Sequence, residues 1–122
     1  MTAPDRIAET VRTYVDGLGK LRPQEIVALY AEDGVVEDPV GTEPHRGREA
    51  LLEFYAGTVA VPMATELLTL KVVPGQAAFH FRMSVFIDPQ KPLIIAPIEI
   101  MTFDDDGKIT SMKAYWSPED SN

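Results

Sequence analysis

The sequence predicts an α+β fold in which three N-terminal helices cover one face of an antiparallel sheet. Apolar residues recur at helical spacing in three segments that precede Pro62. Beyond Pro62, strand-like runs alternate with turn signals at residues 74–75, 88–92 and 104–107. Helices gathered on one face of an antiparallel sheet are typical of α+β domains.

Length and composition indicate one globular domain over residues 1–122. Apolar residues make up 45% of the chain and charged residues 25%, which is an ordinary globular mixture. The net charge of -8 repels phosphate backbones and anionic lipids, so we expect neither a nucleic-acid nor a membrane partner. The absence of cysteine excludes disulfides, a thiolate nucleophile and cysteine-ligated metals. No signal peptide or membrane-spanning run is visible in the sequence, so we expect a cytoplasmic location.

The first helix is predicted to begin with Thr2 as its N-cap. Pro4 lies in the first turn, and Asp5 completes a capping box. Gly17 and Gly19 end the helix. The apolar residues that recur at helical spacing, and so form the inward face, are Ile7, Val11, Tyr14 and Leu18.

A second helix is predicted from Pro23 to about Gly34, followed by a short strand over residues 35–38 and a loop over 40–47. A third helix follows that loop. The inward residues of the second helix are Ile26, Val27, Leu29 and Tyr30. Those of the third helix are Leu51, Phe54, Tyr55 and Val59.

The segment from Leu93 to Phe103 is predicted to be a strand with two apolar faces, because successive residues point to opposite sides. One face carries Leu93, Ile95, Pro97, Glu99, Met101 and Phe103. The other face carries Ile94, Ala96, Ile98, Ile100 and Thr102. Antiparallel sheets usually leave one face to water. A second copy of the chain is the simplest cover for the other face, so we expect a homodimer.

Two carboxylates stand out as candidates for chemistry. Glu99 is the one ionisable residue on its apolar strand face, and a buried, unpaired carboxylate costs several kcal/mol, so it should hold its proton. The alternative is a frayed strand end with a solvated Glu99. Asp38 ends a Val-Val-Glu-Asp-Pro run, where the alternative is an ordinary turn aspartate.

Three tyrosines are predicted to be buried: Tyr14, Tyr30 and Tyr55. They are either ordinary core residues or a chain of hydroxyl groups, since a buried phenol normally finds a hydrogen-bond partner. His45 and His80 have no second ligand at metal spacing, so no metal site is predicted. The sequence contains neither a phosphate-binding glycine loop nor a serine nucleophile elbow.

Several runs of the sequence resemble the bacterial Δ5-3-ketosteroid isomerases, and the likeness covers nearly the whole chain. The most specific run is Val-Glu-Asp-Pro-Val-Gly. The resembling segments are residues 26–31, 36–41, 43–44, 53–56, 96–98 and 108–116. The resemblance implies a cone-shaped fold of the nuclear-transport-factor-2 type, with a curved antiparallel sheet wrapped around the three helices.

The resemblance also implies roles for individual residues. Asp38 matches the family's general base and Tyr14 its main oxyanion donor, while Glu99 replaces the aspartic acid that usually donates a second hydrogen bond. Tyr30 and Tyr55 match tyrosines that support the catalytic one. The residues that match the lining of an apolar steroid pocket are Phe54, Met83, Met112, Ala114 and Trp116.

The implied reaction moves a C=C bond of a 3-oxo-Δ5-steroid into conjugation with its ketone, with no cofactor and no metal. Asp38 would carry the proton, and Tyr14 with a protonated Glu99 would hold the oxyanion. The departure at Glu99 leaves a rival reading open: a protein of the same fold that binds a steroid or another apolar small molecule with little turnover.

Overall fold

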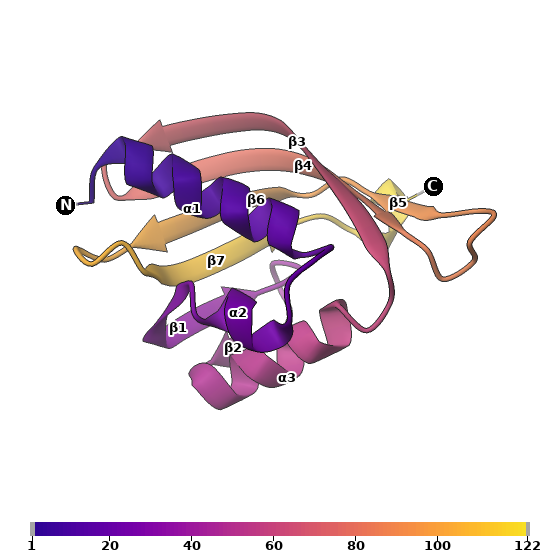
Figure 1. Cartoon of the computed structure of the whole chain (residues 1–122), viewed down its shortest axis with the longest axis horizontal. Coiled ribbons are helices and arrows are strands. Elements are labelled where there is room, and N and C mark those ends of the chain that lie inside the picture. The colour runs from indigo at the N-terminus through magenta and orange to yellow at the C-terminus, as the bar shows by residue number, and fades with distance from the viewer. Residues whose placement is uncertain (1, 122) are drawn as a thin grey trace.

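The computed structural model describes residues 2–121 and consists of three helices and a seven-stranded sheet (Figure 1). The helices are α1 (Pro4–Gly17), α2 (Pro23–Val27) and α3 (Arg48–Thr58), and a 3-10 turn covers Pro118–Asp120. The strands are β1 (Tyr30–Glu37), β2 (His45–Arg46), β3 (Met63–Val73), β4 (Gln76–Val85), β5 (Leu93–Ile95), β6 (Ile98–Phe103) and β7 (Ile109–Tyr115). The predicted α+β class is confirmed.

The sheet has the strand order β2-β1-β7-β6-β4-β3, and β5 pairs with β4. The predicted meander from β3 to β7 is antiparallel throughout. The exception to an all-antiparallel sheet is β1, which runs parallel to β7. This parallel pair brings the end of the first strand next to the end of the last one.

The predicted strand from Leu93 to Phe103 is interrupted between β5 and β6. Both pieces nevertheless keep one register against β4, with Met83 opposite Ile95 and His80 opposite Ile98. The break falls at Pro97, which has no N–H group to donate to a ladder. The alternation of faces therefore survives the break, and Ile95, Pro97 and Glu99 remain on one side.

The sheet curves around α1, which packs against β3 and β4 (Figure 1). The register of β3 and β4 shifts between Leu67 and Thr69, and such irregularities bend a strand. Helices α2 and α3 pack on each other, and α3 also packs on β1 and β2. A cavity remains between the end of α3 and the strands β4, β5 and β6.

Several local predictions are wrong. The N-cap of α1 is Ala3, which makes no side-chain cap, because the Thr2 hydroxyl donates instead to the backbone oxygen of Asp104. The second helix ends at Val27 and not near Gly34, so Tyr30 lies at the start of β1. Pairing with β7 outweighs the helical spacing there, since β1 pairs with that strand from its first residue.

The short strand predicted before Asp38 is in fact longer and begins eight residues before Asp38, at Tyr30. His45 lies in β2 and not in a loop.

The core beneath the sheet is one cluster whose largest members are aromatic. Those with at most 1% of their surface exposed are Tyr14, Tyr30, Tyr55, Phe79 and Phe81. No helix within residues 2–121 is both long and apolar enough to cross a membrane.

Candidate functional site

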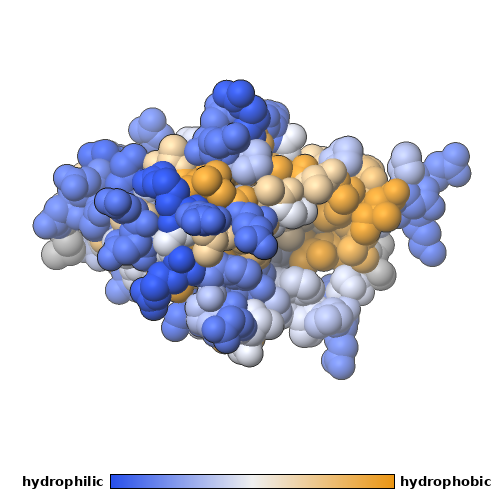
Figure 2. All heavy atoms as spheres, turned by 90° about the horizontal axis from the view of Figure 1, so that it is seen from below, coloured by the Kyte–Doolittle hydropathy of each residue, from blue (hydrophilic) through white to orange (hydrophobic). Residues whose placement is uncertain are grey.

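A cavity of about 290 Å³ opens between the C-terminal end of α3 and the strands β4, β5 and β6. Its wall is apolar apart from a few side chains. The lining residues are Asp38, Phe54, Gly57, Thr58, Val61, Met63, Met83, Val85, Ile95, Pro97, Glu99 and Trp116. Seen from below, hydrophobic side chains gather in the half of the molecule that carries the β4–β5 hairpin, just inside its hydrophilic tip, and hydrophilic side chains cover most of the opposite end (Figure 2).

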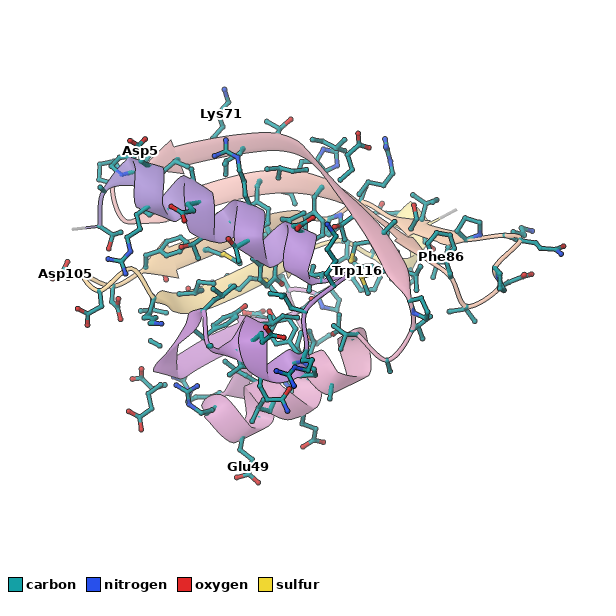
Figure 3. All side chains as sticks on the ribbon, viewed as in Figure 1. Asp5, Glu49, Lys71, Phe86, Asp105 and Trp116 are labelled. Atoms are coloured by element: carbon teal, nitrogen blue, oxygen red, sulfur yellow. The ribbon has the colours of Figure 1, made fainter. Side chains whose placement is uncertain are left out.

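Asp38 directly follows β1 and is fixed in place from β7. The parallel pairing puts Glu37 opposite Lys113, and the Val40 amide donates a 2.8 Å hydrogen bond to the Ala114 oxygen. Trp116, just after β7, points into the interior (Figure 3), and its indole nitrogen donates a 2.7 Å hydrogen bond to Oδ1 of Asp38. One oxygen of the carboxylate is thus held, and its side chain borders the cavity.

The pKa of Asp38 is raised above its ordinary value, chiefly because burial penalises the carboxylate. The Trp116 hydrogen bond and the charge of His45 act in the opposite direction. A base with a moderately raised pKa takes a proton more readily than a solvated aspartate does.

Glu99 is the second residue of β6 and lies between Phe79 on β4 and Ala114 on β7. It is 2% exposed, and its Oε1 has no hydrogen-bond partner within residues 2–121. Burial raises its pKa well above the usual range, the nearby negative charge of Asp38 raises it further, and the Tyr14 hydroxyl opposes both. The protonated acid is therefore favoured, and in that form it is a hydrogen-bond donor at the cavity wall.

The three buried tyrosines form a chain of hydroxyl groups. The Tyr14 and Tyr55 oxygens are 3.0 Å apart, and those of Tyr30 and Tyr55 are 2.5 Å apart. Burial raises the pKa of each phenol well above 10, so all three keep their protons. Of the two readings that the sequence left open, the hydroxyl chain is the one observed. Tyr14 is the end of the chain that lies near Glu99.

Five of the ten residues that the sequence singled out border the cavity: Asp38, Phe54, Met83, Glu99 and Trp116. The other five are almost fully buried and lie outside its wall: Tyr14, Tyr30, Tyr55, Met112 and Ala114. Two of these five have neighbours that explain their burial. Met112 pairs with Met101 in the core, and Ala114 lies beside Glu99.

Sequence reasoning did not assign Gly57, Thr58, Val61, Met63 and Val85 to the site. Ile95 and Pro97 were also unassigned, although their signal was present, because the strand alternation places them on the same face as Glu99. The segment between α3 and β3 carries no periodic pattern. Its place on the wall follows from where the curved β3 brings it.

The cavity wall has few polar side chains that could bind a ligand. The Thr58 hydroxyl donates to the Phe54 backbone oxygen at 3.1 Å, so this donor is used within its own helix. The remaining polar side chains of the wall are Asp38, Glu99 and Trp116. The cavity therefore suits an apolar molecule with one polar end. Within the described chain, no three His, Asp or Glu side chains come together as metal ligands.

Comparisons with known proteins find a family, a relative and a solved structure that resemble this chain. The family model described as the SnoaL-like domain matches residues 11–112. A steroid Delta-isomerase of Nocardioides simplex is 44% identical over 114 residues, which cover 93% of this chain and 92% of that protein. A solved structure of the epoxide hydrolase/cyclase-like enzyme SalBIII, studied for pyran ring formation in the polyether salinomycin, has a TM-score of 0.91. The match covers 100% of this chain and 98% of that chain. At 24% sequence identity it shows a likeness of fold.

Proposed function

We propose that the chain, which belongs to the SnoaL-like domain family, is an isomerase that moves the C=C bond of a 3-oxo-steroid from Δ5 to Δ4. The observation that carries the proposal is the pair of carboxyl groups on one apolar wall. Asp38 is held by Trp116, and the buried Glu99 has an Oε1 without a partner among residues 2–121. The 44% identity to a steroid Delta-isomerase supports it.

In the proposed mechanism Asp38 is the base. Its carboxylate removes a proton from the carbon between the ketone and the C=C bond, and the electron pair of that C–H bond spreads into a dienolate. The protonated Asp38 then returns the same proton to the far carbon of the dienolate, which leaves the new C=C bond conjugated with the ketone. Trp116 holds one carboxylate oxygen throughout, so the other keeps its direction. This transfer of a proton within the substrate needs neither a cofactor nor a metal.

Tyr14 and protonated Glu99 are the proposed donors to the oxygen of the dienolate. Donors that are already oriented where charge develops, away from water, are the usual source of large rate effects. Tyr55 links the Tyr14 hydroxyl to that of Tyr30, which holds Tyr14 in one orientation. Glu99 as a carboxylate would repel the oxyanion, so its raised pKa is a requirement of the mechanism.

The remaining predicted residues have supporting roles in the proposal. Phe54 and Met83 form the apolar wall against which the steroid rings pack. Met112 and Ala114 lie in the core behind that wall, and Ala114 keeps the space beside Glu99 small. Residues 1–122 act as one domain.

We also propose that the chain works as a homodimer through the outer face of the sheet. Ile98 is 50% exposed in the middle of that face, between His80 on β4 and Tyr115 on β7, and Tyr115 is itself 45% exposed. Exposed apolar strips on a sheet favour association. The neighbouring Ile94, Ala96 and Ile100 are half-buried.

The test of the activity is the growth of enone absorbance when 5-androstene-3,17-dione is added. We expect turnover by the wild type and a loss of at least about 100-fold in Asp38→Asn, because the amide keeps the shape but cannot take the proton. Glu43→Gln, at an exposed acid of the following loop, is the matched control and should keep wild-type turnover. Equal rates in Asp38→Asn and the wild type would overturn the base assignment.

The second candidate is an apolar-ligand-binding protein with little turnover. The observation that favours it is Glu99 itself, whose side chain is one methylene longer than the aspartic acid expected from the resemblance, so its hydroxyl sits differently. Both candidates predict steroid binding, so affinity does not separate them. Binding of the steroid without enone formation by the wild type would favour this one.

A further inference from the structure

His45 lies behind the cavity wall, against the ring of Phe54. Its imidazole stacks on the Phe54 ring, with centroids 4.8 Å apart and planes at 41°. Phe54 in turn lies edge-on to Tyr55, at 4.9 Å and 82°. Because Phe54 borders the cavity and Tyr55 belongs to the hydroxyl chain, His45 is the outermost of three aromatic rings that lead into the site.

The strand register directs His45 toward Asp38. His45 on β2 pairs with Val36 on β1, and Asp38 follows two residues later, directly after the end of β1. Diagonal neighbours of an antiparallel pair lie about 7 to 8 Å apart, within reach of long side chains, and Asp38 stands in that relation to His45 where the chain leaves the strand. The charge of His45 lowers the pKa of Asp38, which agrees with this placement.

The other charged groups around His45 are placed less favourably than Asp38 to interact with its imidazole. The elements that pack against β2 are β1 and α3. Glu37 is on the opposite face of β1, and its carboxylate accepts a hydrogen bond from the Gly41 amide. Arg46 on β2 itself shares that opposite face. The exposed charged residues of these elements and the adjoining loop are Glu32, Asp33, Glu43, Arg46, Arg48, Glu49 and Glu53. Tyr30 and Tyr55 are buried phenols that keep their protons.

We propose that His45 is a positioning residue for Asp38: its imidazolium, held against Phe54 behind the wall, keeps the Asp38 carboxylate ionised and extends the working range toward acid pH. The proposal rests on the proposed function, in which Asp38 must be ionised to take a proton. A positive charge near a carboxylate favours its ionised form, and the charge of His45 acts on Asp38 in this direction.

The sign of the effect follows from the direction in which the His45 charge acts on Asp38. Removing the positive charge raises the pKa of Asp38, so the base becomes protonated, and inactive, at a higher pH. His45→Gln should therefore move the acid limb of the kcat/KM profile upward by about half a pH unit. His45→Arg keeps a charge at every pH and should leave the acid limb at or below its wild-type position.

The decisive experiment follows the Asp38 carboxyl carbon by NMR during a pH titration of protein labelled at aspartate, with the signal assigned by its loss in Asp38→Asn. The expected midpoints are highest in His45→Gln and equal or lower in His45→Arg, relative to the wild type. Arg46→Gln removes the same charge from the neighbouring residue on the opposite face, and it should leave the midpoint unchanged. This measurement needs no turnover, so an inactive wild type would refute the proposed isomerase without affecting the result for His45.

The kcat/KM profiles of the same variants separate electrostatics from packing. If His45 only supports Phe54, then His45→Gln and His45→Arg lower the whole profile together and neither moves its acid limb. That result, or an Asp38 midpoint in His45→Gln within about 0.2 units of the wild type, would overturn the proposal.

Discussion

The indole nitrogen of Trp116 donates a 2.7 Å hydrogen bond to Oδ1 of Asp38 and so ties the end of β7 to the end of β1. The two residues are far apart in the sequence and meet because β1 and β7 pair in parallel. The hydrogen bond leaves Asp38 with one directed oxygen. It also lowers the pKa of that carboxyl against the effect of burial.

Trp116→Phe should raise the pKa of Asp38, since the variant removes a donor to the charged form. A hydrogen bond to a charged group contributes about 1.5 to 3 kcal/mol, so we expect the acid limb of kcat/KM to move up by about one pH unit. The loss of activity should be largest at low pH. Tyr115→Phe, at the exposed neighbour, is the control. An acid limb that stays in place would show that the hydrogen bond is not made to the catalytic base.

Glu99→Gln should keep more activity than Glu99→Ala, because the amide still offers a donor to the oxyanion and the alanine does not. The infrared difference spectrum of the wild type at pH 7 should contain the carbonyl band of a protonated carboxylic acid. That band should be absent from Glu99→Gln. An ionised Glu99 in the steroid-bound protein at this pH would contradict the donor role.

The raised pKa of Glu99 also predicts how stability depends on pH. The folded state holds this proton more tightly than the unfolded chain, so the free energy of unfolding should fall as pH rises above the unfolded value of about 4.3. The fall should be about 1.4 kcal/mol per pH unit until Glu99 ionises in the folded protein. Urea unfolding at pH 4, 6 and 8 should therefore show Glu99→Gln gaining on the wild type with rising pH. A constant difference across this range would contradict the predicted proton.

Much of the fold could be predicted from the sequence, and the misses have a common cause. The inward faces of α1 and α3 follow the helical period: Val11 and Leu51 are both 0% exposed. The prediction for the region around Tyr30 was wrong because its apolar spacing fits a helix. In the structure this region pairs with a strand that starts 79 residues later, at Ile109. Long-range pairing of this kind has no local signal.

The candidate site, like the fold, could be predicted only in part from the sequence. Glu99 could be recognised as anomalous because the strand alternation alone places a carboxyl group among apolar residues. The surroundings of Asp38 could not be predicted, since Trp116 binds it from just beyond β7 and the charge of His45 on β2 acts on its pKa. The order of the tyrosine hydroxyls likewise depends on contacts between α1, α3 and β1.

Ile98→Lys should convert the proposed homodimer into monomer or aggregate, because it places a charge in the centre of the outer face. Light scattering should give the wild type twice the chain mass of 13.5 kDa. Ile87→Lys makes the same change at a residue that is 71% exposed in the β4–β5 hairpin and serves as the control. A well-behaved wild-type monomer would contradict the dimer.

In the proposed mechanism Asp38 carries one proton from carbon to carbon inside the cavity, and a deuterium label would follow that proton. A 3-oxo-Δ5-steroid deuterated at the carbon between the ketone and the C=C bond would be converted in ordinary water, and its product examined by NMR and mass spectrometry. This mechanism predicts deuterium at the far carbon of the new enone in a substantial fraction of the product. Enone that forms at the wild-type rate with its deuterium entirely replaced by solvent hydrogen would contradict transfer by a single shielded carboxyl group.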